Sequence, residues 1–125
     1  MFLQVKDLSY SYGETEAVEQ ASIQVDRGEF VGIIGPNGSG KSTLLKTIYR
    51  GLVPDRGSIT LEGEDLLRMP YKRSALQMAV VGQEHEIPFD FSVEEVVAMG
   101  RAPHKRLFDI DTKKDRDIVR HALEC

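Results

Sequence analysis

The sequence has little from which a disulfide, a zinc site or a membrane span could be built. Its only cysteine, Cys125, is the last of 125 residues, so no disulfide can form within one chain, which suits a reducing compartment. The three histidines are too scattered to resemble a metal-ligand spacing. Apolar runs such as residues 30–34 and 96–99 are far too short to cross a bilayer. We therefore expect no disulfide, no cysteine-based zinc site and no membrane insertion.

Basic residues are also scarce. Lysine and arginine number 16 against 20 acidic residues, so the net charge is −4 and the broad basic footprint of a nucleic-acid binder is missing. No secretory signal is expected, because Asp7 interrupts the start of the chain before any apolar region forms. The 41% hydrophobic and 29% charged residues are typical of a soluble globular protein. Composition thus predicts a modest cytosolic domain, or one held at a membrane through a protein partner.

One motif in the chain is specific. Residues 35–42 read Gly-Pro-Asn-Gly-Ser-Gly-Lys-Ser and match the phosphate-binding P-loop (Walker A) pattern G-x-x-x-x-G-K-[ST] without a mismatch. The glycines lack a Cβ, so the backbone can take positive φ angles and curl its N–H groups around a phosphate chain. Lys41 would supply a charge for the β- and γ-phosphates, and the Ser42 hydroxyl would be a ligand for Mg²⁺.

The segments beside this loop support the motif. Residues 30–34 are apolar at every position but Gly32, which predicts a central strand covered on both faces. Residues 43–50 have helical spacing, and the amides and dipole at the start of such a helix also favour an anion. The order of strand, loop and helix predicts a nucleotide-binding α/β core.

The rest of the chain is expected to alternate short strands and helices. Further strands are predicted at residues 1–12, 17–25, 58–61 and 78–81, the first two as an antiparallel pair. Helical segments are predicted at residues 71–76, 93–99 and from 111 or 112 onward, with loops at 82–91 and 100–108. Ser92 and Glu95 give the second helix a capping-box signature. The mixed charges at 109–120 predict a solvated helix face, with an apolar face at Ile118, Val119, Ala122 and Leu123.

The segments around the loop closely resemble the ATP-binding subunits of ABC transporters. The resemblance covers essentially the whole chain, and its most similar stretches are residues 8–13, 28–45, 54–59, Gln83 and 96–104. The stretch at 96–104 looks most like importer ATPases for iron chelates, haem and cobalamin. The resemblance implies that residues 1–125 are an N-terminal part of a nucleotide-binding domain. Residues 1–91 would form the P-loop core with an antiparallel β subdomain, and residues 92–125 would begin a helical subdomain.

The resemblance also implies roles for single residues. Tyr12 matches the aromatic position that stacks on adenine, and Thr43 would place a hydroxyl near the α-phosphate. Gln83 matches the Q-loop glutamine, a catalytic residue whose amide oxygen reaches Mg²⁺, although Gly82 stands before it where the family often has proline. The implied ATP contacts are Tyr12, Gly35, Pro36, Asn37, Gly38, Ser39, Gly40, Lys41, Ser42 and Thr43, with Ser42 and Gln83 as the Mg²⁺ ligands.

The implied partners are transmembrane permease subunits and, in the full-length protein, a second ATP-binding subunit in a homodimer at the inner face of the cell membrane. Hydrolysis in this family needs an apolar run ending in Asp, a following catalytic Glu, an L-S-G-G-Q-type signature and a switch histidine. None of these is present in the sequence. We therefore expect a fragment that belongs to a transport ATPase but binds ATP weakly and hydrolyses it negligibly by itself.

Two other interpretations stay open. The chain could be a P-loop kinase of small molecules, although no arginine-rich lid can be recognised. It could also be a non-catalytic remnant that binds membrane subunits without ATP. A GTPase is disfavoured, because Asn37 is the only asparagine and the N-K-x-D guanine reader is therefore absent.

Overall fold

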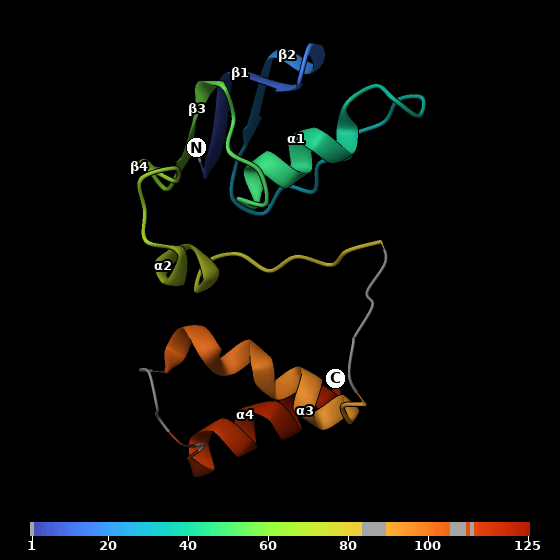
Figure 1. Ribbon diagram of the computed structural model, residues 1–125. Helices are drawn as coiled ribbons and strands as arrows, with labels where there is room; N and C mark the ends of the chain where they lie inside the picture. Colours follow the sequence, from blue (N-terminus) through green and yellow to red (C-terminus); the bar gives the residue numbers. More distant parts are fainter. Residues whose placement is uncertain (1, 84–89, 106–109, 111) are drawn as a thin grey trace. The chain divides into compact units, whose positions relative to one another are not determined.

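The structure is a computed structural model that describes residues 2–83, 90–105, 110 and 112–125 (Figure 1). Packing divides the chain into two compact units, Met1–Pro70 and Tyr71–Cys125. The subdomain boundary predicted at residue 91 refers to a whole nucleotide-binding domain and stays a prediction. In the parts of the chain that the structure describes, every helix is too short or too polar to span a bilayer.

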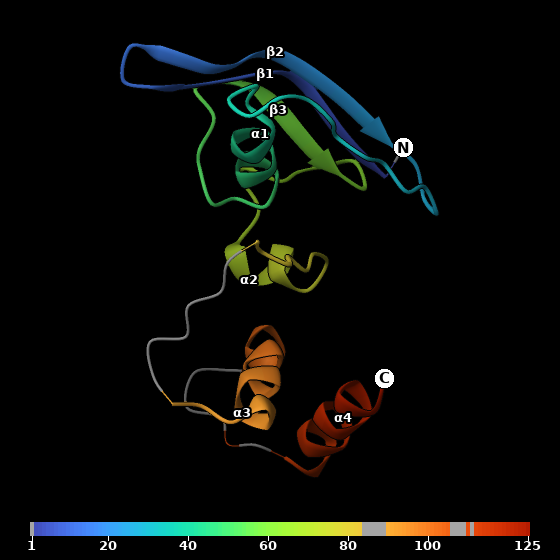
Figure 2. The ribbon, with the colours of Figure 1, turned by 90° about the vertical axis from the view of Figure 1, so that its right-hand side faces the viewer.

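The first unit is built on a four-stranded sheet in the order β2-β1-β3-β4. Strand β1 (Leu3–Tyr12) pairs antiparallel with β2 (Thr15–Val25), which confirms the predicted pair, and on its other edge with β3 (Arg56–Leu61). The two-residue β4 (Glu64–Asp65), which the sequence did not predict, pairs antiparallel with β3. Figure 2 shows helix α1 (Lys41–Ile48) beside this sheet.

A β-bulge in β1 explains the break in its apolar alternation. Asp7 has a φ of 49°, and the register with both neighbouring strands shifts after Val5 and Lys6 respectively. A bulge adds one residue to a strand, so the buried apolar positions change from odd to even numbers, from Val5 to Leu8. These two residues and Ile59 are 0–1% exposed and form the centre of the first unit's core.

Two apolar segments predicted to be strands, the first of them a central strand covered on both faces, are not strands. Residues 30–34 form no ladder within the described chain, and the side chains of Phe30 and Ile34 are 101% and 96% exposed. Residues 78–81 of the second unit are likewise extended and unpaired, and Val81 is 94% exposed. An apolar strand is buried only where neighbouring strands and covering helices exist. The strands of the antiparallel sheet pair with one another, and they provide no such neighbour.

The second unit is helical. It comprises α2 (Tyr71–Ala75), α3 (Val93–Ala98), the 3₁₀-helix η1 (Met99–His104) and α4 (Lys113–Glu124). The predicted capping box is confirmed: Ser92 Oγ accepts from the Glu95 N–H at 3.1 Å, and the Glu95 carboxylate accepts from the Ser92 N–H. The predicted loop at residues 100–108 is wrong for residues 100–104, which belong to η1. The fixed φ angle of Pro103 is compatible with this helical turn. Residues 84–89 and 106–108 of the two predicted loops lie outside the described residues.

Asp115 corrects the expectation that residues 109–120 are only a solvated face. Its side chain is buried, and its carboxylate accepts from Arg101 Nε at 3.0 Å and from the Thr112 N–H and hydroxyl, both at 3.0 Å. Lys105 Nζ lies 3.5 Å from the same carboxylate. A carboxylate can be buried where it is paired and hydrogen-bonded, so this group joins η1 to α4. Of the predicted apolar face of α4, Val119 alone is buried.

The environment of Asp115 makes the second unit sensitive to acid. The Thr112 N–H and the Arg101 guanidinium hold the pKa of Asp115 well below its ordinary value. A lowered folded-state pKa adds stability above the unfolded pKa of about 3.9, and this stability is lost as the pH falls toward the folded value. Asp115→Asn should therefore show a shallower loss of unfolding free energy between pH 5 and pH 2 than the unchanged chain, measured by urea unfolding with circular dichroism.

The matched control is Asp117→Asn, which removes an exposed carboxylate from the same helix. It should leave the pH profile of the unchanged chain intact. Equal profiles for Asp115→Asn and the unchanged chain would show that the ion cluster does not stabilise the folded state.

The exposed segments at 30–34 and 78–81 should make the chain bind apolar dyes and be marginally stable. Replacing Phe30 and Ile34 by serine should lower the fluorescence of bound anilinonaphthalene sulfonate, because the contiguous apolar surface is reduced. The unfolding free energy should change by less than about 0.5 kcal/mol per substitution, as at other exposed positions. Val53→Ser, at an exposed residue outside both segments, is the control. A cooperative melt without dye binding would contradict this prediction.

Candidate functional site

The predicted P-loop lies between the extended segment 30–34 and α1. It turns at Asn37 and Gly38, and the Ser39 N–H donates to the Pro36 carbonyl at 3.2 Å. Gly38 and Gly40 have φ angles of 84° and 92°, so two of the motif's glycines use the left-handed region as the sequence predicted. The Leu44 N–H then donates to the Gly40 carbonyl at 2.9 Å and closes the first turn of α1.

Gly40 is where the loop meets the sheet. A Cβ on this residue would lie 2.3 Å from the carbonyl oxygen of Ala17 in β2 and 3.5 Å from a methyl group of Val18. The first contact is far shorter than any real Cβ contact, and its partner is a backbone atom of a paired strand. Glycine is therefore required at position 40 because there is no space for a Cβ and because the φ angle is positive. This close approach places the start of α1 against β2.

The start of α1 is suited to an anion. Its N-cap, Gly40, offers no side-chain hydrogen bond, and the first turn contains no acidic residue. The first N–H groups of a helix have no partner within the helix, and its dipole adds a partial positive charge there. Such N–H groups are the donors that bind anions at the starts of helices.

Lys41 adds the full positive charge. Its ammonium donates to the carbonyl oxygens of Gly35 and Pro36, the second at 3.1 Å. The side chain thus folds back over its own loop. The loop is tight here, because a Cβ on Gly35 would lie 2.8 Å from Ser39 Oγ. The sequence placed Lys41 at the phosphate-binding position, and the structure places its charge directly over the loop.

The structure also brings Tyr12 to this helix. Tyr12 ends β1 and is 49% exposed, and its hydroxyl oxygen accepts a long hydrogen bond of 3.4 Å from the Thr43 hydroxyl. Thr43 is a buried residue in the first turn of α1, and the exposed Ser42 precedes it. Residues 31 positions apart in the sequence therefore meet beside the loop.

Gln83 belongs to the second unit. It is exposed and follows the extended segment 78–81, and its role rests on the family resemblance alone. The preceding residue, Gly82, is also exposed.

Sequence reasoning missed two residues near Tyr12. The Tyr10 ring packs edge to face on the Tyr12 ring, with 4.9 Å between centroids and 79° between planes. The carboxylate of Asp55 accepts from the Ser11 N–H at 2.8 Å. Two tyrosines at i and i+2 of a predicted strand share one face, and that spacing could have indicated the ring pair. The contact of Asp55 joins residues 44 positions apart and leaves no such signal.

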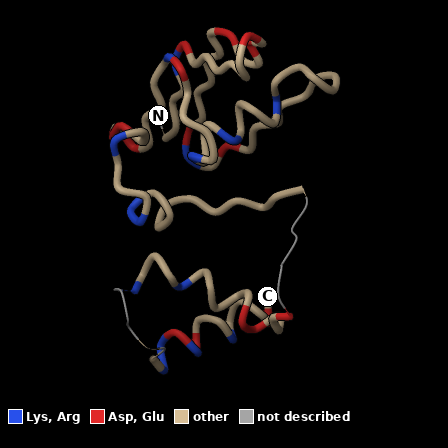
Figure 3. The backbone as a smooth tube through the Cα atoms, in the orientation of Figure 1, with Lys and Arg blue, Asp and Glu red and all other residues tan. Residues whose placement is uncertain are grey.

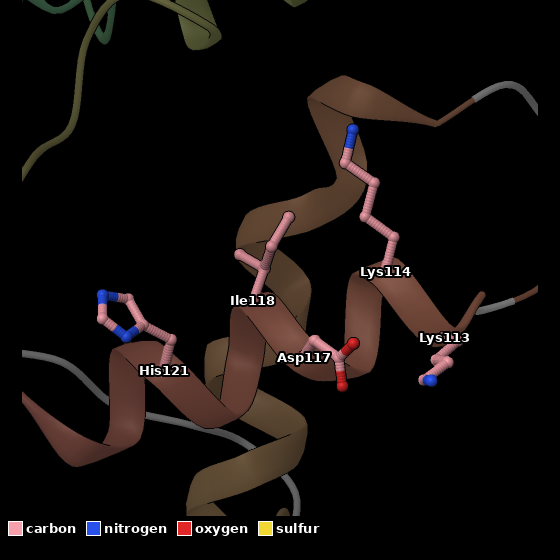
Figure 4. A pocket seen from close by; sticks show the side chains of 5 residues that line it. All are labelled: Lys113, Lys114, Asp117, Ile118 and His121. Atoms are coloured by element: carbon pink, nitrogen blue, oxygen red, sulfur yellow. The ribbon is translucent and has the colours of Figure 1, made fainter.

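Other surface features are less suited to a ligand. A shallow hollow on α4 is lined by residues of that helix alone, with charges of both signs around Ile118: Lys113, Lys114, Asp117, Ile118 and His121 (Figure 4). Figure 3 shows acidic and basic residues interspersed along the described parts of the chain. The described residues contain no group of three or more His, Cys, Asp or Glu side chains that could hold a metal ion.

The close approach at Gly40 predicts a difference between two glycines of the same loop. Gly38→Ala should lower the unfolding free energy by about 1–2 kcal/mol, because only the left-handed φ is strained and no atom lies near its Cβ. Gly40→Ala adds a clash with the backbone of β2 and should lower it by at least about 1 kcal/mol more. Urea unfolding followed by circular dichroism measures both variants. Equal losses would contradict the contact with Ala17.

Comparisons with known proteins support the motif. The family model described as ABC transporter matches residues 18–124. The chain is 37% identical over 123 residues to the ferric enterobactin transport ATP-binding protein FepC of Escherichia coli K12, covering 98% of this chain and 45% of that protein. It is 40% identical over 123 residues to the hemin import ATP-binding protein HmuV of Pseudomonas putida, covering 98% and 47%. The chain thus spans a little under half the length of these relatives.

Solved structures show the same likeness. The ATP-binding subunit of an ABC transporter is 35% identical, with a TM-score of 0.71 over 82% of this chain and 43% of that one. A dimeric ATP-binding cassette in a post-hydrolysis state, bound to ADP and Pi, has a TM-score of 0.74 over 98% of this chain and 56% of that one. Its identity is 24%, so this second likeness concerns the fold alone.

Proposed function

Because the chain belongs to the ABC transporter family of ATP-binding proteins, we propose that its P-loop, residues 35–42, binds the triphosphate of ATP. The fold class predicted from the sequence, a P-loop α/β core with an antiparallel β subdomain, is confirmed by these likenesses. The observation that most supports the proposal is the position of the Lys41 ammonium over a loop that opens an uncapped helix.

The triphosphate would be bound mainly by backbone donors. The loop N–H groups, of which Pro36 has none, and those of the first turn of α1 would surround the phosphate oxygens, with the Asn37 and Ser39 side chains beside them. Lys41 would exchange its two carbonyl partners for the β- and γ-phosphates, which are stronger acceptors. Thr43 would approach the α-phosphate from the first helical turn.

Mg²⁺ would be bound together with the nucleotide. By the family resemblance its protein ligands would be the Ser42 hydroxyl and the Gln83 amide oxygen, the hard oxygen donors that Mg²⁺ takes alongside phosphates and water. The phosphates of the nucleotide would supply further oxygen ligands. When bound, the ion would neutralise phosphate charge, and Ser42 would orient it from the start of α1.

Tyr12 would form the adenine platform. An aromatic ring offers a face on which any base can stack, and this ring is half-exposed beside the loop that would bind the phosphates. The contact between Tyr12 and Thr43 supports one continuous site for base and phosphates in the first unit.

We place this site in the ATPase subunit of an importer for an iron chelate, haem or a cobalamin-like solute. The basis is the names of the two curated relatives and the stretch at 96–104. The subunit would work at the inner face of the cell membrane, with permease subunits and a second ATP-binding subunit in a homodimer. Phosphoryl transfer depends on positioning and charge stabilisation, and the sequence lacks the family's signature, catalytic Glu and switch His. We expect weak ATP binding and negligible hydrolysis from these residues alone.

ATP titration of a lysine pair tests the proposal. Lys41→Ala should weaken binding of Mg-ATP by at least about tenfold, because a charged hydrogen-bond donor to phosphate is lost. Lys46→Ala, which removes a lysine from the last turn of the same helix, is the matched control and should bind as the unchanged chain does. Isothermal titration calorimetry measures all three affinities.

Three outcomes would contradict parts of this proposal. Equal ATP affinity in the unchanged chain and Lys41→Ala would favour a remnant that binds membrane subunits without ATP. Phosphate release well above the Lys41→Ala level would refute the expectation of negligible hydrolysis. Transfer of phosphate to a small metabolite would favour a kinase.

A further inference from the structure

We propose that Tyr10 is a positioning residue of the nucleotide site, whose ring fixes the Tyr12 ring in the orientation on which adenine stacks. This inference rests on the proposed ATP site. Tyr10 would affect the affinity for the base, whereas the P-loop would bind the phosphates.

The two rings form a specific pair. Tyr10 and Tyr12 are at i and i+2 of β1, so both side chains lie on one face of the strand. Their centroids are 4.9 Å apart and their planes differ by 79°. The edge of one ring therefore meets the face of the other, which is the arrangement that the ring quadrupoles favour. This contact restricts rotation of Tyr12 about its side-chain bonds.

Tyr10 is the better anchored member of the pair. It pairs with Val18 of β2 inside the hairpin and is partly buried, whereas Tyr12 pairs with Thr15 at the last position before the turn. Asp55 fixes the strand on both sides of Tyr10. Its N–H donates to the Ser9 carbonyl at 2.8 Å, and its carboxylate accepts from the Ser11 N–H at 2.8 Å.

Tyr12 has a second contact at its other end. Its hydroxyl oxygen accepts from Thr43 Oγ1 at 3.4 Å, which is a long hydrogen bond and a weak restraint by itself. The ring contact with Tyr10 must therefore do most of the positioning. With both contacts in place, the ring is still 49% exposed and can stack on a base.

Orientation of this ring matters for binding. A side chain that is already ordered loses less rotational freedom when a ligand binds. If Tyr10 is removed, Tyr12 must be ordered by the nucleotide itself, and base affinity falls. The phosphates bind to Lys41 and the loop amides, so binding of a ligand without a base should not depend on Tyr10.

The experiment compares Mg-ATP with inorganic tripolyphosphate, which has the phosphates and no base. Tyr10→Ala should bind Mg-ATP roughly two- to tenfold more weakly, which is the range for loss of an aromatic pair, and tripolyphosphate as the unchanged chain does. Tyr10→Phe keeps the ring and should bind both ligands within about twofold of the unchanged chain. Calorimetric titration of each variant gives the affinities.

A double variant tests whether Tyr10 acts through Tyr12. In a Tyr12→Ala chain, the further change Tyr10→Ala should have no effect on ATP affinity, because the ring to be positioned is gone. Tyr71→Ala, which removes an exposed tyrosine of the second unit, should change neither affinity.

The outcomes separate this inference from a structural role of Tyr10. If Tyr10→Ala weakens ATP and tripolyphosphate equally, the residue only stabilises the fold and the inference is wrong. Should Tyr10→Ala fail to fold, Tyr10→Leu, which keeps apolar volume without a ring, replaces it. ATP affinity of Tyr10→Leu equal to that of the unchanged chain would then refute the inference.

If Lys41→Ala loses affinity for ATP while the Tyr10 variants keep it, the inference fails and the ATP site stands. If Lys41→Ala binds ATP normally, the ATP site fails as well.

Discussion

The approach of Gly40 to the backbone of β2 is the constraint on which the candidate site depends. It brings the first turn of α1 to the hairpin formed by β1 and β2, where a Cβ would lie 2.3 Å from the Ala17 oxygen. Tyr12 closes that hairpin, so the same contact brings the aromatic ring to Thr43. The start of α1, which we propose binds phosphate, and the exposed ring of Tyr12 therefore lie close together, and this approach requires a residue without a side chain at position 40.

The apolar strands of the antiparallel sheet and the apolar segments 30–34 and 78–81 differ in the neighbours that are required to bury them. Strands β1 and β3 pair with each other in an antiparallel ladder, and this pairing buries core residues of both strands although the strands are far apart in the sequence. Residues 30–34 and 78–81 have the composition of central strands, and such strands need partners on both edges and helices on both faces. The described residues provide these partners to neither segment, so Phe30, Ile34 and Val81 face solvent.

Charge has a structural role in the helical unit that a count of charges does not reveal. Asp115 is one acid among several in a mixed run, and the run as a whole indicates a solvated face. Its position three residues after Thr112 forms a second capping box, and that geometry turns the carboxylate toward Arg101 and Lys105. One carboxylate thus begins α4 and joins it to η1, and its protonation weakens both functions.

The sequence by itself determined the local features: the P-loop and its glycine φ angles, the β1–β2 pair, the capping box at Ser92 and the family. The glycine angles and the capping box depend on residues within a few positions of one another, where backbone sterics and hydrogen bonding act directly. The β1–β2 pair joins strands that follow one another in the chain. Only the tertiary structure decided that Gly40 contacts Ala17, that Tyr12 meets Thr43 and that Asp55 fixes the strand at Ser11. It also decided that two apolar segments have no paired strand among the described residues. These features depend on which segments distant in the sequence pack against one another. The periodicity of apolar residues in the sequence contains no information about such packing.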